Sequence, residues 1–322
     1  MKAIQIARIG GPESLQLVDI ERPVPSPDQV LVQVHAIGVN FIDIYYREGV
    51  YPATLPLTLG QEGAGVIVEI GKNVEQFRVG ERVAWCTDLG AYAEYAVVPE
   101  SHLVHVPAQV SFEDAAASLL QGMTAQYLTT STFPLKSGDT VLLHAGAGGV
   151  GVLLTQMAVR AGAHVISTVS TPEKAELARS AGAHDVILYT KEDFEPAVKR
   201  ITGGRGVDVV YDSVGKETFE RSLKCLRPRG MLVLFGASSG AVPPFDPIQL
   251  SRNGSLFLTR PSLTHYTRTR EELDARSTDV FQRLERGDLQ LSIHASFPLA
   301  EAAKAQEELQ ARRTTGKILL TP

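Results

Sequence analysis

The sequence has little cysteine, no long apolar run and no excess of basic residues. Only two cysteines, Cys86 and Cys225, occur in 322 residues, and no Cys-x-x-Cys pair is present. This excludes a disulfide framework and a zinc site built from cysteines. No stretch approaches the roughly 18 consecutive apolar residues of a membrane span. The net charge of −5 argues against nucleic acid as the main partner, because binding to phosphates depends on clustered Lys and Arg.

The composition is that of an ordinary globular protein. Apolar residues make up 44% and charged residues 21% of the chain, which is enough for a sizeable core. A chain of 322 residues is expected to form two domains. The first residues, MKAIQIARIGG, lack the apolar segment of a signal peptide, so we expect a cytoplasmic protein.

Up to about Pro107 the chain consists of short β-type runs separated by Gly and Pro. The runs mix β-branched and aromatic residues with polar ones, which is typical of strands. We expect strands at Leu15–Ile20, Gln29–Ile37, Gly65–Glu69, Arg82–Trp85 and Ala91–Val97. The pattern predicts a compact, mostly antiparallel β domain.

After Ser111, which starts a helix as its N-cap, apolar strands begin to alternate with helices. The expected strands are Thr140–His144, His164–Val169, Asp185–Tyr189, Val207–Asp212 and Met231–Phe235. The expected helices are Val150–Ala161, one starting at Pro172, one around Asp193–Arg200, and Lys216–Leu226. This alternation predicts a doubly wound parallel sheet of the Rossmann type. Two later helices, Glu271–Arg286 and Leu299–Gln310, and β runs at Gln290–Phe297 and Lys317–Leu320 could cap that sheet or return to the first domain.

The strongest motif is glycine-rich and matches G-x-G-x-x-G. It consists of Gly146, Ala147, Gly148, Gly149, Val150 and Gly151. It directly follows an apolar strand and starts a helix, which is the context that a dinucleotide site needs. Backbone N–H groups at the helix start can then face a pyrophosphate. The alternative is a turn whose glycines serve only strand–helix packing.

The strand after this helix indicates which dinucleotide binds. NAD enzymes usually place Asp or Glu at its end to bind the ribose 2′-hydroxyl. Here the strand ends at Ser170 without a carboxylate, and Lys174 lies in the first turn of the next helix, where the helix dipole disfavours a cation. A 2′-phosphate held by Ser170, Thr171 and Lys174 explains this arrangement, so the sequence favours NADPH over NADH. The alternative is a solvated surface lysine.

Ligands of doubly wound sheets lie outside the carboxyl ends of the strands. That rule adds five candidate cofactor contacts, namely Tyr189, Ser213, Phe235, Gly236 and Ser238. Each of them is equally well explained as a loop residue without a ligand. His144, at the end of the strand before the glycine turn, is expected only to orient backbone. His102 and His105 are expected in strands, and no histidine forms a recognisable motif with a Ser or Cys nucleophile, so hydrolase chemistry has no support.

Together these segments resemble the medium-chain dehydrogenase/reductase superfamily, and within it the zinc-free, zeta-crystallin-type quinone oxidoreductases. The matching segments are Gly38–Asp43, Gly60–Gly65, Gln121–Ala125, His144–Gly151, Tyr211–Gly215 and Thr259–Ser262. The resemblance covers essentially the whole chain. It implies a GroES-like catalytic domain at residues 1–124 and 263–322 and an NADPH-binding Rossmann domain at residues 125–262.

The zinc alcohol dehydrogenases of the same superfamily provide a contrast. Their catalytic zinc is held by a Cys and a His in the segments where this chain has Asn40 and Gln61. The stretch Leu119–Thr124 has no Cys or His, and Arg82–Tyr95 contains only Cys86. Because zinc needs three or four thiolate, imidazole or carboxylate ligands, metal catalysis is not expected. An activated acceptor such as a quinone needs no metal to accept hydride.

The resemblance also implies the residues at the nicotinamide end of the site. These are Asn40, Asp43, Thr124 and the loop after Leu258, with Arg260 as a further candidate. Tyr45 and Tyr51 could donate a proton to the developing oxyanion or stack on a flat quinone, or could simply be packing residues.

We therefore expect NADPH-dependent, metal-free hydride transfer to quinones. Two alternatives stay open: reduction of conjugated enones, or an NADPH-binding or RNA-binding protein with little turnover. The resemblance further suggests a homodimer that forms through the sheet edge near Ser255–Leu258.

Overall fold

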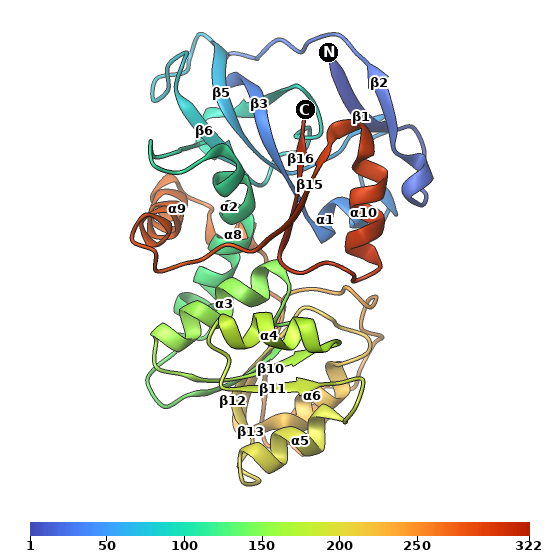
Figure 1. Cartoon of the computed structure of the whole chain (residues 1–322), viewed down its shortest axis with the longest axis vertical. Coiled ribbons are helices and arrows are strands. Elements are labelled where there is room, and N and C mark those ends of the chain that lie inside the picture. The colour runs from blue at the N-terminus through green and yellow to red at the C-terminus, as the bar shows by residue number, and fades with distance from the viewer. The chain divides into compact units, whose positions relative to one another are not determined.

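The computed structural model describes all of residues 1–322, and the chain forms two compact units (Figure 1). The first unit comprises Met1–Met123 and Thr267–Pro322, and the second comprises Thr124–Tyr266. None of the helices combines the length and the apolar character needed to cross a membrane.

The first unit contains two sheets. A small antiparallel sheet has the strand order β2 (Gln16–Asp19), β1 (Lys2–Ile6), β4 (Leu57–Thr58). A seven-stranded sheet has the order β15-β16-β3-β5-β6-β8, with β7 also paired to β3. Its strands are β3 (Gln29–Val39), β5 (Glu62–Ile70), β6 (Arg82–Trp85), β7 (Tyr95–Pro99), β8 (Val104–His105), β15 (Ile293–Pro298) and β16 (Lys317–Thr321). Only the β15–β16 pair is parallel, so the predicted mostly antiparallel domain is confirmed.

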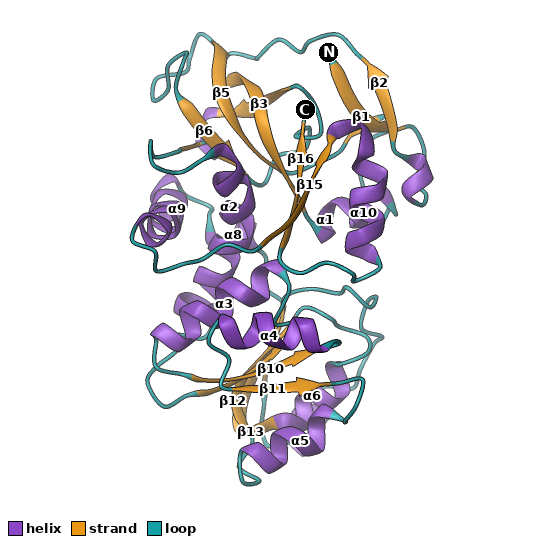
Figure 2. Ribbon diagram, in the orientation of Figure 1, coloured by secondary structure: helices purple, strands orange, loops and turns teal.

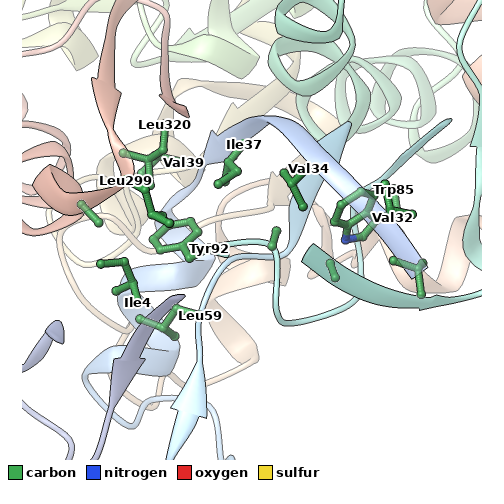
Figure 3. Close-up of a cluster of buried hydrophobic side chains, with 14 of the residues drawn as sticks. Ile4, Val32, Val34, Ile37, Val39, Leu59, Trp85, Tyr92, Leu299 and Leu320 are labelled. Carbon is green, nitrogen blue, oxygen red and sulfur yellow. The ribbon is translucent and has the colours of Figure 1, made fainter. Parts of the chain in front are cut away.

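The core of the first unit lies between these sheets and their helices. Buried side chains of β3, including Val32 and Val34, pack with Trp85, Tyr92 and other apolar residues (Figure 3). The helical segments associated with this unit are η1 (Pro12–Ser14), α1 (Phe41–Arg47), η2 (Glu100–His102), α2 (Phe112–Tyr127), α9 (Arg270–Glu285), η4 (Leu299–Glu301) and α10 (Ala302–Gln310). Because β16 pairs with β3 in antiparallel register, the last β runs return to the first unit, which settles the question that the sequence left open.

The second unit is a six-stranded, wholly parallel sheet with the order β11-β10-β9-β12-β13-β14. Its strands are β9 (Thr140–His144), β10 (His164–Val169), β11 (Asp185–Leu188), β12 (Val207–Asp212), β13 (Leu226–Leu234) and β14 (Phe257–Thr259). Its helices are η3 (Leu128–Thr132), α3 (Gly149–Arg160), α4 (Pro172–Ser180), α5 (Phe194–Ile201), α6 (Phe219–Cys225), α7 (Ile248–Arg252) and α8 (Leu263–Tyr266).

Helices α3 and α4 cover one face of this sheet, and α5 and α6 cover the other (Figure 2). All six residues of β12 are buried, as expected for a strand that is covered on both faces. The chain order reverses between β9 and β12, where doubly wound sheets bind their ligands. The predicted Rossmann-type sheet is confirmed.

Three local predictions were wrong. The strand expected at Ala91 begins only at Tyr95, because residues 91–93 instead bond irregularly to Leu59, Gly60 and Ile4. The helix expected from Lys216 begins at Phe219, since Asp212 holds the preceding residues in a turn. His102 ends a short 3-10 turn, where its ring bonds to Asp88, and does not lie in a strand.

Candidate functional site

The glycine turn joins β9 to α3 and leaves the start of that helix uncapped. Ala145 adopts a left-handed conformation with φ of 56°, and the helix begins at Gly149 with Gly148 as its N-cap. No side chain caps the helix, and no acidic residue lies in its first turn. Uncapped N–H groups at the positive end of a twelve-residue helix suit an anion, which fits the pyrophosphate of a dinucleotide.

Two glycines of the turn are required by close packing. A Cβ on Gly146 would lie 1.6 Å from Ser167 Oγ, and one on Gly151 would lie 2.3 Å from the carbonyl oxygen of Ala145. A Cβ on Gly148 would meet only that same oxygen, at 3.2 Å. Gly146 and Gly151 therefore let the helix approach the strand closely, and Gly148 leaves the turn open on its other side.

Buried polar residues connect the strand ends beneath this turn, and we call them the His144 cluster. Its members are His144, Thr168, Asp212, Thr218 and Ser222. His144 Nδ1 lies 2.8 Å from Thr168 Oγ1, and His144 Nε2 lies 2.9 Å from Ser222 Oγ. Because the Ser222 hydroxyl donates to Asp212, Nε2–H must donate to Ser222, and Nδ1 accepts from Thr168. Burial lowers the pKa of His144, so the ring stays neutral.

Asp212 of this cluster shapes the loop after β12. Its Oδ1 accepts the N–H groups of Val214 at 2.8 Å and Gly215 at 3.0 Å. The next residue, Ser213, accepts the N–H of Ser238 at 3.0 Å, and a Cβ on Gly236 would lie 2.6 Å from the same carbonyl oxygen. The structure thus brings the predicted contacts Ser213, Gly236 and Ser238 together at the ends of β12 and β13.

The predicted phosphate residues lie together at the ends of β10 and β11. Thr171 caps α4 by accepting the N–H of Lys174 at 3.3 Å, so Lys174 is in the first turn of that helix. The carbonyl oxygen of Ser170 accepts the Thr190 hydroxyl at 2.8 Å, and Tyr189 is 44% exposed beside it. The other candidates of this unit are the half-buried Phe235, the buried Thr124 on α2, Leu258 on β14, and the exposed Arg260, which donates to the carbonyl oxygen of Leu234.

In the first unit, Asn40 and Asp43 form the capped start of α1. The carboxylate of Asp43 accepts the N–H of Asn40 at 2.8 Å and the hydroxyl of Tyr92 at 3.0 Å, both at Oδ2. Asp43 is fully buried and its Oδ1 has no hydrogen-bond partner. Burial raises the pKa of Asp43 to about 7, although both hydrogen bonds and Lys317 act in the opposite direction.

Asn40 and Asp43 belong to a buried network of seven polar residues, which we call the Asn40 cluster. Its members are Asn40, Asp43, Arg47, Glu62, Tyr92, Gln306 and Lys317. Arg47 Nη1 donates to Gln306 Oε1 at 2.7 Å, and Gln306 Nε2 donates to Tyr92 Oη at 3.4 Å. With the Tyr92–Asp43 bond, these contacts link the guanidinium of Arg47 to the carboxylate of Asp43 through two neutral groups.

Lys317 and Glu62 form the other half of this cluster. Lys317 Nζ lies 2.6 Å from Glu62 Oε2 and 2.7 Å from Asn40 Oδ1, and Glu62 Oε1 accepts the N–H of Leu120 at 2.7 Å. Sequence reasoning missed Glu62 and Lys317 as site residues. Each is a lone charged residue directly before an apolar run that forms a buried strand, and that signal could have revealed them.

The predicted substrate tyrosines lie in an aromatic group at the end of α1. The ring of Tyr51 contacts those of Tyr45 and Tyr46 edge-on, with centroids 5.6 Å away in both cases. Phe41 lies 6.5 Å from Tyr45. Burial raises the pKa of Tyr46, which also bonds to Gln61. The structure therefore brings Tyr45 and Tyr51 together and adds Tyr46.

The residues present do not fit a zinc site. Asn40 and Gln61 occupy the positions at which the zinc alcohol dehydrogenases have a Cys and a His ligand. Both side chains are held in hydrogen bonds, Gln61 to the carbonyl oxygen of Thr87 and Asn40 to Glu62. No group of three or more His, Cys, Asp or Glu residues in the chain could hold a metal ion.

Comparisons with known proteins identify the two units. The family model of the alcohol dehydrogenase GroES-like domain matches residues 26–108, and the family model of the zinc-binding dehydrogenases matches residues 149–282. A quinone oxidoreductase of Pseudomonas aeruginosa is 50% identical over 100% of this chain and 99% of its own length. A 2-haloacrylate reductase of Burkholderia is 45% identical over 99% of this chain and 98% of its own. The crystal structure of an Escherichia coli quinone oxidoreductase complexed with NADPH matches with a TM-score of 0.98, at 43% identity over 100% of both chains.

Proposed function

The chain belongs to the quinone oxidoreductase family, and we propose that it is an NADPH-dependent reductase that transfers hydride to quinones without a metal ion. The observation that carries the proposal is the full-length similarity to proteins named quinone oxidoreductase, at 50% identity for the Pseudomonas aeruginosa relative. NADPH is supported by the Escherichia coli relative, which was solved with that cofactor. The uncapped start of α3 supports this assignment, because its free N–H groups would suit the pyrophosphate of such a cofactor.

We assign cofactor binding to the second unit and substrate chemistry to the first. NADPH, when bound, supplies the hydride. The N–H groups at the start of α3 would hold its pyrophosphate, while Ser170, Thr171 and Lys174 would hold the 2′-phosphate. The rest of the cofactor would be lined by Thr124, Tyr189, Ser213, Phe235, Gly236, Ser238, Leu258 and Arg260. Asn40 and the tyrosines Tyr45 and Tyr51 would border the hydride acceptor and contact it. Asp43 is fully buried, so we propose that it positions Asn40.

A steady-state assay of NADPH oxidation with 1,4-benzoquinone tests the activity. Turnover well above the uncatalysed background is expected, and its absence would refute quinone reduction. The 45% identity to a 2-haloacrylate reductase favours a second candidate, reduction of a conjugated carbonyl. Measuring NADPH oxidation with 2-chloroacrylate as the acceptor decides between quinone and conjugated-carbonyl reduction, because the preferred acceptor has the larger kcat/KM.

The phosphate assignment can be tested apart from the acceptor. Lys174→Ala is expected to raise the KM for NADPH about tenfold or more and barely change that for NADH, because only NADPH carries the 2′-phosphate. Arg179→Ala is the matched control, since Arg179 lies in the last turn of the same helix and pairs with Glu176. Equal effects of Lys174→Ala on the two cofactors would refute the assignment.

Whether Tyr51 donates a proton to the acceptor can be tested separately from its packing. Tyr51→Phe keeps the ring and its edge contacts but removes the hydroxyl. If Tyr51 donates the proton, kcat/KM falls by about 10²-fold, and an unchanged value would leave it a stacking role.

The exposed edge of the parallel sheet supports a homodimer. Strand β14 pairs only with β13, and Phe257 on it is 57% exposed. Pairing of this edge with a second copy of the chain would cover both the unpaired backbone of β14 and the Phe257 side chain. Sedimentation of the wild type is expected to give a dimer, and Phe257→Asp is expected to shift it toward monomer. The two cysteines are buried and form no disulfide, which is consistent with our proposal that the protein functions in the reducing cytoplasm.

A further inference from the structure

The side chain of Asn40 is held in one orientation by a buried ion pair. Lys317 Nζ donates to Asn40 Oδ1 at 2.7 Å and to Glu62 Oε2 at 2.6 Å. Asn40 Nδ2 donates to Glu62 Oε2 at 2.8 Å and to the carbonyl oxygen of Gly38 at 3.1 Å. The exposed fractions are 2% for Lys317, 0% for Glu62 and 5% for Asn40, so water competes little for these bonds.

This arrangement allows only one orientation of the carboxamide. If the amide turned over, its NH2 group would face the ammonium of Lys317 and its oxygen would face the carboxylate of Glu62. Two charge-assisted hydrogen bonds would become two repulsive contacts. Both Nδ2 protons are already donated, which leaves only the carboxamide oxygen to face a further group. Asn40 can therefore offer a ligand only an acceptor, and the partner group must be an N–H or O–H donor.

The fold makes room for this pair at the junction of three segments. Glu62 is the first residue of β5 and lies opposite Gly38 of β3, while Lys317 is the first residue of β16, which pairs with the same part of β3. A Cβ on Gly38 would lie 2.3 Å from Glu62 Oε2, so only glycine leaves space for the carboxylate there. The Leu120 N–H fixes the second carboxylate oxygen at 2.7 Å.

Stability gives no sufficient reason for such a pair. Replacing a buried ion pair by apolar residues of similar volume is often neutral or stabilising, because the pair must first be desolvated. We propose that Lys317 and Glu62 are positioning residues that present Asn40 Oδ1 as a fixed acceptor during hydride transfer. This inference rests on the proposed function, since it concerns a residue assigned to that site.

The test separates orientation from stability with single and double substitutions. Lys317→Met leaves Glu62 as an unpaired buried charge, so both the Tm and kcat/KM with 1,4-benzoquinone are expected to fall. Lys317→Met combined with Glu62→Gln removes both charges. The Tm is expected to return most of the way to the wild-type value, while kcat/KM stays at least about tenfold low because the amide can now turn over. Wild-type kcat/KM in the double variant would overturn the proposal.

Arg227→Met is the matched control. Arg227 pairs with the buried Asp208 at the start of β12, at the opposite end of that strand from Asp212. This variant is expected to lower the Tm without changing kcat/KM per folded molecule.

A second readout does not depend on turnover. The two Nδ2 protons of Asn40 are expected to exchange slowly with solvent in the NMR spectrum of the cofactor-free protein, and faster in the double variant. If the wild type reduced no quinone but showed slow exchange, the proposed function would fail while the orientation stood. Rapid exchange in a wild type that does reduce quinones would refute the orientation alone.

Discussion

The two buried polar clusters stabilise their units in different ways. The Asn40 cluster contains two basic and two acidic side chains, and its members lie up to 277 positions apart in the chain. The His144 cluster contains one carboxylate, which is satisfied by backbone N–H groups and hydroxyls no more than ten residues away. The first cluster therefore joins distant segments through paired charge. The second connects neighbouring strand ends and shapes local turns through neutral donors and close packing.

This difference predicts how each unit fails. Removing one member of a charge pair leaves its partner buried and uncompensated, which is costly. A region that depends on close packing is most sensitive to added volume. Three predictions test the contrast.

The largest effect is expected for Arg47→Met. The Arg47 side chain is fully buried and donates to Gly10, Gln306 and other acceptors, and it is the cation linked to Asp43. Its loss leaves several acceptors unpaired, among them the buried Gln306 Oε1, and each unpaired buried acceptor costs about 1–3 kcal/mol, so the free energy of unfolding should fall by about 3–5 kcal/mol. Chemical denaturation measures this change.

Lys2→Met is the control for that variant. Lys2 pairs with Asp19, but the two side chains are 50% and 73% exposed. Such a pair contributes about 0–1 kcal/mol. Similar losses for Lys2→Met and Arg47→Met would show that burial of the charge has no special weight in the first unit.

Much of the second unit could be predicted from sequence because its signals are local. The glycine turn, the strand before it and the helix after it are contiguous, and the alternation of apolar strands and helices allows few arrangements. The boundaries were harder to predict. The helix expected from Lys216 begins at Phe219, since Asp212 bonds the intervening backbone.

The charge network of the first unit could not be predicted in the same way. Glu62 and Lys317 are separated by 255 residues and meet only because β16 returns to pair with β3. Sequence left open whether the last β runs return to the first domain. Asn40 and Asp43 were named by resemblance to a family, but that resemblance did not show that Asp43 is fully buried or that an ion pair orients Asn40.

A moderate effect is expected for Gly146→Ala in the glycine turn. The new methyl group would lie 1.6 Å from Ser167 Oγ and 3.0 Å from its Cβ, so Ser167 must turn its hydroxyl away or the strand and the turn must separate. The cost of such overpacking is about 1–3 kcal/mol, and NADPH binding should weaken because the turn moves. Adding Ser167→Gly removes the clashing side chain, whose hydroxyl has no hydrogen-bond partner. The double variant should therefore be more stable than Gly146→Ala alone, and a lower Tm would contradict the packing explanation.

The smallest effects concern pH, and the two clusters should respond in opposite directions. The pKa of Asp43 is raised to about 7 in the folded protein, so the folded state retains a proton that the unfolded chain has already lost. This contribution to stability is complete below the ordinary pKa of Asp and is lost as the pH rises through about 7. The pKa of His144 is lowered, so its contribution is complete above the ordinary pKa of His and is lost as the pH falls.

Between about pH 5 and about pH 7 the two contributions therefore partly cancel in the wild type. Asp43→Asn leaves only the histidine contribution, so its Tm should rise with pH more steeply than that of the wild type. His144→Gln leaves only the aspartate contribution, so its Tm should change in the opposite sense. Thermal unfolding across this range measures both slopes. An Asp43→Asn slope equal to that of the wild type would mean that Asp43 is ionised throughout, with Arg47 and Lys317 outweighing its burial.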